Sequence, residues 1–364
     1  MDKDKLAKII YGLKIANTVV ENGNKVDANV ILSALFDRRQ SSIDSYQSSF
    51  DPIVHLNQSD FESLKNRKIC HFYSSKNTLT GYYYEVPNPK GIVIYVHGLG
   101  SLADDWYAIG QDYFVRHGFN VFAIDLTCCG RSEGFGVKGL AQSALDVVAA
   151  IRYVRDSIDR KSPLFLFGHS WGGYGVAASM YFEDVNAVAS LSGFSSPIDE
   201  MLGVPSSFVE DFGVELPANL LNKEELIAAA KNRWPEYYDL SAIDAINSSN
   251  VPILIVQGGK DKIVTMDGSS IYSKKDKIRT NNVEYILLPD RDHLNLFRSK
   301  DSARYDASVK SLRKDLEKTY GKNISKVPNN VLEDFRKSFN RDMTSQVNEN
   351  LFDTIVNFFE IHSK

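Results

Sequence analysis

The spacing of apolar residues changes along the chain and predicts different elements in different segments. Over the first 60 residues, apolar side chains recur three and four positions apart, which predicts helices over 5–20 and 27–37. From about residue 69 the pattern becomes that of strands, which we expect over 68–75, 79–86 and 91–98. The last two of these strands are joined by a predicted turn, PNPKG.

After residue 100, short apolar runs alternate with amphipathic stretches. The runs predict strands over 120–126, 163–170 and 186–193, and the stretches predict helices over 106–118 and 140–158. Strands that are apolar throughout and separated by helices are typical of a mostly parallel sheet with helices on both faces. The fold class is therefore expected to be α/β.

The strand signals stop between about residues 196 and 250 and resume at 252–261 and 283–293. The pattern of the residues between these strands predicts short helices, and we expect this segment to be a helical cap inserted into the core. A charged helical segment follows, which we expect to present a solvated face, and an amphipathic helix ends the chain. The predicted units are an N-terminal helical extension (1–60), the first part of the core (61–195), the cap (196–250), the second part of the core (251–299), a helical insertion (300–346) and a final core helix (347–364).

Composition narrows the possible partners. The chain has 364 residues, of which 43% are hydrophobic and 24% charged, and its formal net charge is -4. This near balance, without a long Lys/Arg run, argues against a nucleic-acid partner. The N-terminus is broken by charges, no segment has the length and apolarity of a membrane span, and the three cysteines do not suggest a disulfide framework. We therefore expect a cytoplasmic protein with reduced thiols.

A serine between glycines stands where the apolar run 163–167 ends. The segment Gly168–Gly172, GHSWG, fits the pattern G-x-S-x-G, in which the serine occupies a tight turn between a strand and a helix. Glycines suit such a turn because backbones approach closely there and the serine is held in an unfavourable conformation. The strand pattern before the motif and the helix pattern after it favour Ser170 as a nucleophile over a serine that merely caps a helix.

A serine hydroxyl needs a base, and the base needs a group that orients it. Asp261 and His293 follow later strands in the order acid then histidine, so we expect them to fill these roles. Competing acids are Asp199, Glu200, Asp290 and Asp292. Competing histidines are His55, His71, His97, His117, His169 and His362.

A tetrahedral intermediate also needs backbone donors for its oxyanion. The expected donors are the N–H of Trp171, at the start of the helix after the serine, and that of Leu99 in the HGLG turn. The dipole of the helix would add to this site. Neither the HGLG turn nor the GHSWGG turn has the residue spacing of a glycine-rich phosphate-binding loop, so a nucleotide site is a weak alternative.

These motifs together resemble those of α/β-hydrolases. The resemblance rests on HGLG (97–100), DLTCCGRSEG (125–134), GHSWGG (168–173), QGGKDKIV (257–264) and RDH (291–293), and covers about residues 70–300 and the last helix. The chain is similar to the serine aminopeptidase/monoacylglycerol-lipase-like and feruloyl-esterase-like groups. This implies the α/β-hydrolase fold with a helical cap insertion, a Ser170–His293–Asp261 triad, an oxyanion hole at Leu99 and Trp171, and no cofactor or metal. The N-terminal helices and the insertion after His293 depart from the minimal pattern.

The expected function is hydrolysis of carboxylic esters through an acyl-enzyme, with a small-molecule acyl ester as partner. A peptidase of the aminopeptidase type or an acyltransferase would use the same three residues, and a non-catalytic binding protein could share the fold. Candidates for an apolar acyl or aryl pocket are the cap residues Phe208, Phe212, Trp234 and Tyr238. The sequence does not choose between a monomer and a homodimer.

Overall fold

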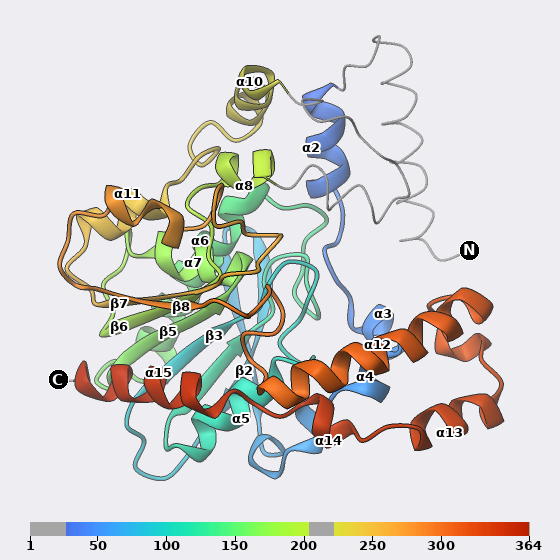
Figure 1. The fold of residues 1–364 in the computed structure, drawn as a ribbon. Helices are drawn as coiled ribbons and strands as arrows, with labels where there is room; N and C mark the ends of the chain where they lie inside the picture. The colour runs from blue at the N-terminus through green and yellow to red at the C-terminus, as the bar shows by residue number, and fades with distance from the viewer. Residues whose placement is uncertain (1–26, 204–221, 364) are drawn as a thin grey trace.

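One eight-stranded sheet forms the centre of the molecule (Figure 1). The computed structural model describes residues 27–203 and 222–363. The strand order is β1-β2-β4-β3-β5-β6-β7-β8. The strands are β1 (Lys68–Ser74), β2 (Asn77–Tyr84), β3 (Ile92–Val96), β4 (Asn120–Ile124), β5 (Leu164–His169), β6 (Ala187–Leu191), β7 (Ile253–Gly258) and β8 (Val283–Leu288). Only the β1–β2 and β2–β4 pairs among these are antiparallel, which confirms the predicted α/β class.

The strands β2 and β3 follow each other in sequence but are not neighbours in the sheet. β4 lies between them, pairing antiparallel with β2 and parallel with β3. The PNPKG segment therefore crosses over β4 instead of closing a hairpin. A parallel neighbour must arrive by a crossover connection, and the helix between β3 and β4 supplies it. The period of the side chains predicted the strands but held no information about this order.

Helices cover both faces of the sheet (Figure 1). On one side lie α6 (Gln142–Tyr153), α7 (Trp171–Ser179) and α11 (Ala242–Ser248), and on the other lie α5 (Ala108–Arg116) and α15 (Glu349–Ile361). The predicted final helix is confirmed, since Phe352 and Phe359 of α15 are fully buried in the cluster on its side of the sheet. Short 3-10 helices occur at Gln58–Asp60, Glu62–Leu64, Gly139–Ala141, Tyr272–Lys277 and Ile324–Lys326, and α6 continues into a π-helical turn at Val154–Ile158.

The predicted cap region is helical where the structure describes it. It contains α8 (Pro197–Gly203), α10 (Lys223–Arg233) and α11. α10 lies beside α2 (Ala28–Phe36), to which Arg233 donates a hydrogen bond at Ser33, whereas α11 packs against α7. The first predicted helix, over 5–20, lies outside the described residues. The division into cap and core stays a prediction.

An outer layer packs at one end of the molecule (Figure 1). It consists of α3 (Ile43–Gln47), α4 (Asp51–Val54), α12 (Lys300–Tyr320), α13 (Asn329–Lys337) and α14 (Arg341–Thr344). Its apolar core is formed by Phe50, Ile53, Val54, Val309, Val327, Leu332 and Phe335. The N-terminal extension and the insertion, predicted as separate units, thus share one small core. The expectation of a solvated charged helix holds only for the outward side of α12, since Asp306 and Val309 are buried.

The three cysteines are free thiols. Cys128 and Cys129 are buried and Cys70 is half-buried. Burial raises the pKa of the Cys128 thiol to about 11, which keeps it protonated and unreactive at neutral pH.

Candidate active site

Ser170 occupies a strained position between β5 and α7. Its φ of 57° and ψ of -120° are rarely adopted by residues other than glycine. Its N–H donates to the carbonyl oxygen of Leu191 at 2.9 Å, which ties the turn to β6. Ser170 therefore stands at the carboxyl end of β5, as the motif predicted.

The glycines around Ser170 are required by close backbone contacts. A Cβ at Gly168 would lie 2.3 Å from the carbonyl oxygen of Gly172. A Cβ at Gly172 would lie 2.4 Å from the carbonyl oxygen of Val96. Both distances are far below van der Waals contact with rigid backbone, so any side chain here would displace the turn that holds Ser170.

The structure brings Ser170, His293 and Asp261 together. His293 Nε2 lies 2.9 Å from Ser170 Oγ, and His293 Nδ1 lies 2.8 Å from Asp261 Oδ2. Both His293 and Asp261 are buried. Three residues that are far apart in the chain thus form one continuous hydrogen-bonded row.

The Asp261 carboxylate is held on both oxygens. Oδ1 accepts hydrogen bonds from the N–H groups of Ile263 and Val264, each at 2.9 Å, and Gln257 Nε2 lies 3.3 Å from Oδ2. Burial alone would raise the pKa of Asp261, but its hydrogen bond to His293 and the bonds to its other oxygen hold that pKa below its ordinary value. Asp261 is therefore ionised at neutral pH and fixes the orientation of the imidazole ring.

The four competing acids make other contacts. Asp199 is bound by Lys274 and by Ser195, and Glu200 is buried with its pKa raised to about 8 by burial. Asp290 is 3.8 Å from Lys260, and Asp292 accepts from the N–H groups of Leu294 and Asn295. Among the described side chains, Asp261 is the acid that hydrogen-bonds His293.

The competing histidines are also engaged elsewhere or exposed. His97 Nε2 accepts from the N–H of Leu126 at 3.1 Å, and its Nδ1 donates to the carbonyl oxygen of Gly98 at 2.7 Å. Burial lowers the pKa of His97 to about 4, so it is neutral and structural. His55 pairs with Asp306, His117 and His362 bond backbone carbonyls, and His71 is exposed.

A buried relay links three loops around the site and was missed at the level of sequence. His169 Nε2 is 2.8 Å from the carbonyl oxygen of His293, which can only accept, so Nε2 carries the proton. His169 Nδ1 then accepts from the Tyr107 hydroxyl at 2.6 Å, and that hydroxyl accepts from the N–H of Gly98 at 2.9 Å. Burial, together with the nearby His293, lowers the pKa of His169 to about 3. Tyr107 carried no motif signal beyond its place in a predicted helix.

The predicted oxyanion donors lie on two sides of Ser170. A Cβ built on Gly98 would lie 3.3 Å from Ser170 Cβ, so the HGLG turn abuts the nucleophile. Trp171 is buried and its indole N–H donates to the carbonyl oxygen of Leu140 at 2.6 Å, whereas Leu99 is exposed. Within the described residues, the backbone N–H groups of Leu99 and Trp171 have no backbone acceptor. Their role toward an oxyanion stays a prediction.

Two of the four residues predicted to line a substrate pocket can be placed. Trp234 is 9% exposed and meets Phe36 edge to face, with ring centroids 5.3 Å apart. Tyr238 is half-buried against the same core cluster. Trp234 is therefore packed as a core residue, and a pocket role for it and for Tyr238 stays a prediction. Phe208 and Phe212 lie outside the described residues.

Two kinds of feature are absent from residues 27–203 and 222–363. No group of three or more His, Cys, Asp or Glu side chains there is placed to hold a metal ion. No helix in these ranges combines the length and apolar composition that crossing a membrane requires.

Comparison with known proteins gives one family match and several distant likenesses. A family described as serine aminopeptidase, S33, matches residues 87–210. A multifunctional-autoprocessing repeats-in-toxin protein of Vibrio cholerae is 30% identical over 105 residues, which is 26% of this chain and 2% of the toxin. The chain thus spans a small fraction of the length of this curated relative.

Solved structures with a similar backbone include an esterase of Pyrococcus furiosus, with a TM-score of 0.49 and 17% identity over 70% of this chain and 90% of the esterase. An acylaminoacyl peptidase of Pyrococcus horikoshii has a TM-score of 0.49 and 15% identity over 70% of this chain and 41% of the peptidase. The matched segment contains both the HGLG turn and the Ser170 turn, and its strands β3, β4, β5 and β6 belong to the mostly parallel sheet described above. Residues 87–210 of this chain are thus similar to the serine aminopeptidase family, and they lie in a chain with the predicted α/β fold.

Proposed function

We propose that the protein is a serine hydrolase that cleaves carboxylic esters through an acyl-enzyme. The observation that carries the proposal is the row of hydrogen bonds from Asp261 through His293 to Ser170, with distances of 2.8 and 2.9 Å. The arrangement matches what nucleophilic catalysis by serine requires: a hydroxyl within reach of a base, and a base oriented by a buried carboxylate.

In the first half of the reaction, Ser170 Oγ attacks the ester carbonyl while His293 Nε2 takes its proton. Asp261 stays ionised and stabilises the imidazolium that forms. The negative charge on the carbonyl oxygen would be received by the N–H groups of Leu99 and Trp171. His293 then gives its proton to the leaving alcohol, and the acyl group remains on Ser170.

In the second half, a water molecule replaces the alcohol. His293 takes a proton from the water as it attacks the acyl carbon, and the collapse of the second intermediate returns the proton to Ser170 Oγ and releases the acid. The relay of Tyr107 and His169 holds the backbone of His293 during both halves and takes no part in the proton transfers.

A panel of 4-nitrophenyl esters of increasing acyl length tests this proposal. The wild-type protein should release nitrophenol, and Ser170→Ala should lower kcat by roughly 10⁴-fold or more. Circular dichroism of both proteins controls for folding. Hydrolysis that persists in Ser170→Ala at the wild-type rate would contradict the proposal.

One alternative activity, peptide hydrolysis, has a specific observation in its favour. Because the match over residues 87–210 is to a family described as serine aminopeptidase, a peptidase is the second candidate. Aminoacyl 4-nitroanilides run beside the esters distinguish the two: a higher kcat/KM for the amides would favour the peptidase. An acyltransferase would instead be revealed by faster turnover when an alcohol acceptor is added.

A further inference from the structure

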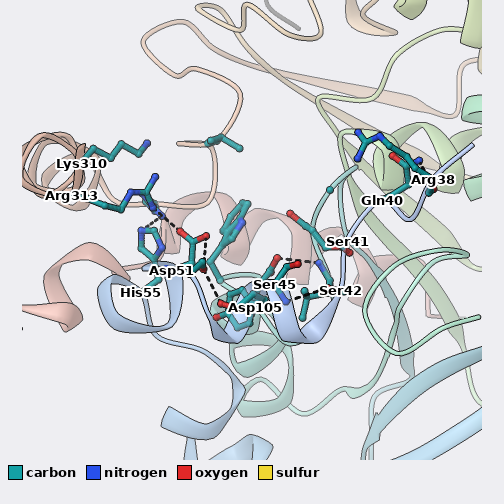
Figure 2. Close-up of a pocket in the computed structure, with 18 residues that line it drawn as sticks. Arg38, Gln40, Ser41, Ser42, Ser45, Asp51, His55, Asp105, Lys310 and Arg313 are labelled. Carbon is teal, nitrogen blue, oxygen red and sulfur yellow. Dashed lines mark hydrogen bonds and ion pairs between the residues drawn. The ribbon is translucent and has the colours of Figure 1, made fainter. Parts of the chain in front are cut away.

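A polar cavity of about 350 Å³ lies between the outer layer and the candidate active site (Figure 2). On the side of the active site it is lined by Gly100 and Leu294, the chain neighbours of Leu99 and His293. Its other walls come from α3, α4 and α12, segments about 250 residues apart in the chain. The cavity therefore exists only because the outer layer has been added to the α/β core.

The walls of the cavity carry more positive than negative charge. The cationic lining residues are Arg38, Arg298, Lys310 and Arg313, and the acidic ones are Asp51 and Asp105. Burial raises the pKa of Asp105 to about 8, and its two oxygens accept hydrogen bonds from the N–H groups of Leu102 and Tyr107. Arg313 and Lys310 reach in from α12, while Arg38 lies at the opposite end (Figure 2). Asp51 is paired with Arg313 at 2.7 Å.

Donors in the cavity wall lack acceptors. Arg298 is 5% exposed, and its Nε has no hydrogen-bond partner among the described residues. The hydroxyl of Tyr46 is likewise buried without a partner there. An unsatisfied buried donor costs about 1–3 kcal/mol, so two of them on one cavity point to a ligand that accepts hydrogen bonds.

The position of the Arg298 side chain is fixed by contacts with its neighbours. Its Nη1 is paired with Asp306 at 2.5 Å, its Nη2 lies 2.9 Å from His55 Nε2, and its guanidinium lies 5.9 Å from the ring of Trp106. Asp306, which is behind the wall, also holds Lys310 at 2.9 Å. These contacts fix the two cations at the cavity and leave Arg298 Nε free to donate.

We propose that this cavity binds an anionic group of the substrate, a carboxylate or a phosphate, so that the preferred esters carry a negative charge near the scissile bond. The substrate part of this inference rests on the proposed function. The anion accepts from Tyr46 and Arg298 and is attracted by Lys310, while Ser170 attacks the carbonyl of the same molecule. Charge-assisted hydrogen bonds of this kind are about twice as strong as neutral ones.

Matched neutral and anionic esters test the proposal with the full-length protein. One series varies the acyl group, 4-nitrophenyl pentanoate against the 4-nitrophenyl monoester of succinic acid. The other varies the alcohol, butanoylglycerol against butanoylglycerol phosphate. The anionic member of at least one series should have a kcat/KM about tenfold or more above its neutral partner, and the two series distinguish carboxylate from phosphate.

Two variants test whether the cavity residues cause the preference for anionic esters. Tyr46→Phe removes a hydroxyl that has no partner to lose, and Lys310→Gln removes a cation while leaving Asp306 its bond to Arg298. Each should lower the ratio of anionic to neutral kcat/KM by about three- to tenfold. The matched controls are Tyr181→Phe, an exposed tyrosine, and Lys314→Gln, an exposed lysine of α12 outside the cavity; both should keep the wild-type ratio.

Binding without turnover separates this inference from the proposed function. Calorimetry on Ser170→Ala should show tighter binding of butanoylglycerol phosphate or of succinate monoester than of the neutral compounds, and Tyr46→Phe in the same background should weaken it. Equal affinities for charged and neutral compounds, or a preference that survives in both cavity variants, would overturn the anion site. Charge-selective binding by a protein that hydrolyses no ester would uphold the anion site and refute the proposed function alone.

Discussion

The candidate active site and the cavity beside it differ in whether their buried polar groups have hydrogen-bond partners. At the active site, each side-chain oxygen of Asp261 and both ring nitrogens of His293 have partners within 2.8–3.3 Å. In the cavity, Tyr46, His55 and Arg298 each leave a buried polar atom without one among the described residues. A satisfied network is already arranged for chemistry, whereas an unsatisfied one is complete only with a ligand.

The two regions also differ in how they are built. In the active site, Ser170 and Asp261 follow the fully buried strands β5 and β7, His293 follows the edge strand β8, and the turn at Ser170 is held by backbone contacts with neighbouring strands. The cavity depends on a small apolar core that joins α4 to α12 and α13. Loss of the outer layer should therefore remove the selectivity of the protein before it removes the chemistry.

The largest expected effect is at the orienting acid. Asp261→Asn should lower kcat for neutral esters by roughly 10⁴-fold, because the amide cannot stabilise the imidazolium and favours the wrong tautomer of His293. Asp292→Asn makes the same chemical change at an exposed neighbour of His293 and should keep wild-type activity. Steady-state kinetics with 4-nitrophenyl esters measures both, and equal activity of the two variants would refute the role given to Asp261.

A substitution that weakens the outer layer should destabilise this layer without destabilising the central sheet. Phe335 is buried in the core of this layer and meets Phe50 edge to face at 5.8 Å. Phe335→Ala should destabilise the layer by about 3–4 kcal/mol, measured by hydrogen exchange of α12 and α13. Phe135→Ala, at a highly exposed phenylalanine, is the control. If exchange in β5 and β6 rose as much as in α12, the two regions would not be independent.

The buried Glu200 should give the core a pH-dependent stability. Burial raises its folded-state pKa from 4.5 to about 8, so the unfolded chain releases this proton at lower pH than the folded protein does. The contribution of Glu200 to stability is therefore greatest below about pH 4.5 and falls as pH rises toward 8, by at most about 1.4 kcal/mol per pH unit.

Glu200→Gln should remove this decline. Urea denaturation of wild type and variant at a series of pH values measures it, and the difference isolates Glu200 from Asp105, whose pKa is also raised to about 8. Parallel stability curves for the two proteins between pH 5 and 8 would show that Glu200 is ionised in the folded state.

The smallest expected effect is in the relay behind His293. Tyr107→Phe removes the hydroxyl that donates to His169 and accepts from Gly98, which should cost about 1–2 kcal/mol of stability. Because His293 is held less firmly, kcat should fall by up to about tenfold with KM little changed. A change in KM alone would place Tyr107 in substrate binding instead.

Features formed by residues close together in the chain could be predicted from the sequence. Features formed by the packing of distant segments could not. The turn at Ser170 requires glycines at fixed offsets between a strand and a helix, and all of these lie within ten residues. The positions of Asp261 and His293 after late strands also follow from chain order, although only the structure shows which acid meets His293. The cavity had no sequence signal, because Tyr46 and Lys310 line it together only through the packing of α3 and α12, which lie far apart in the chain.

Covalent labelling shows whether Ser170 is an activated nucleophile. The wild-type protein is treated with a fluorophosphonate, and the modified residue is located by mass spectrometry of its peptides. We expect one adduct, on Ser170, formed rapidly in the wild type, slowly in Asp261→Asn and not at all in Ser170→Ala. An unlabelled wild type, or an adduct on another residue that survives in Ser170→Ala, would contradict this expectation.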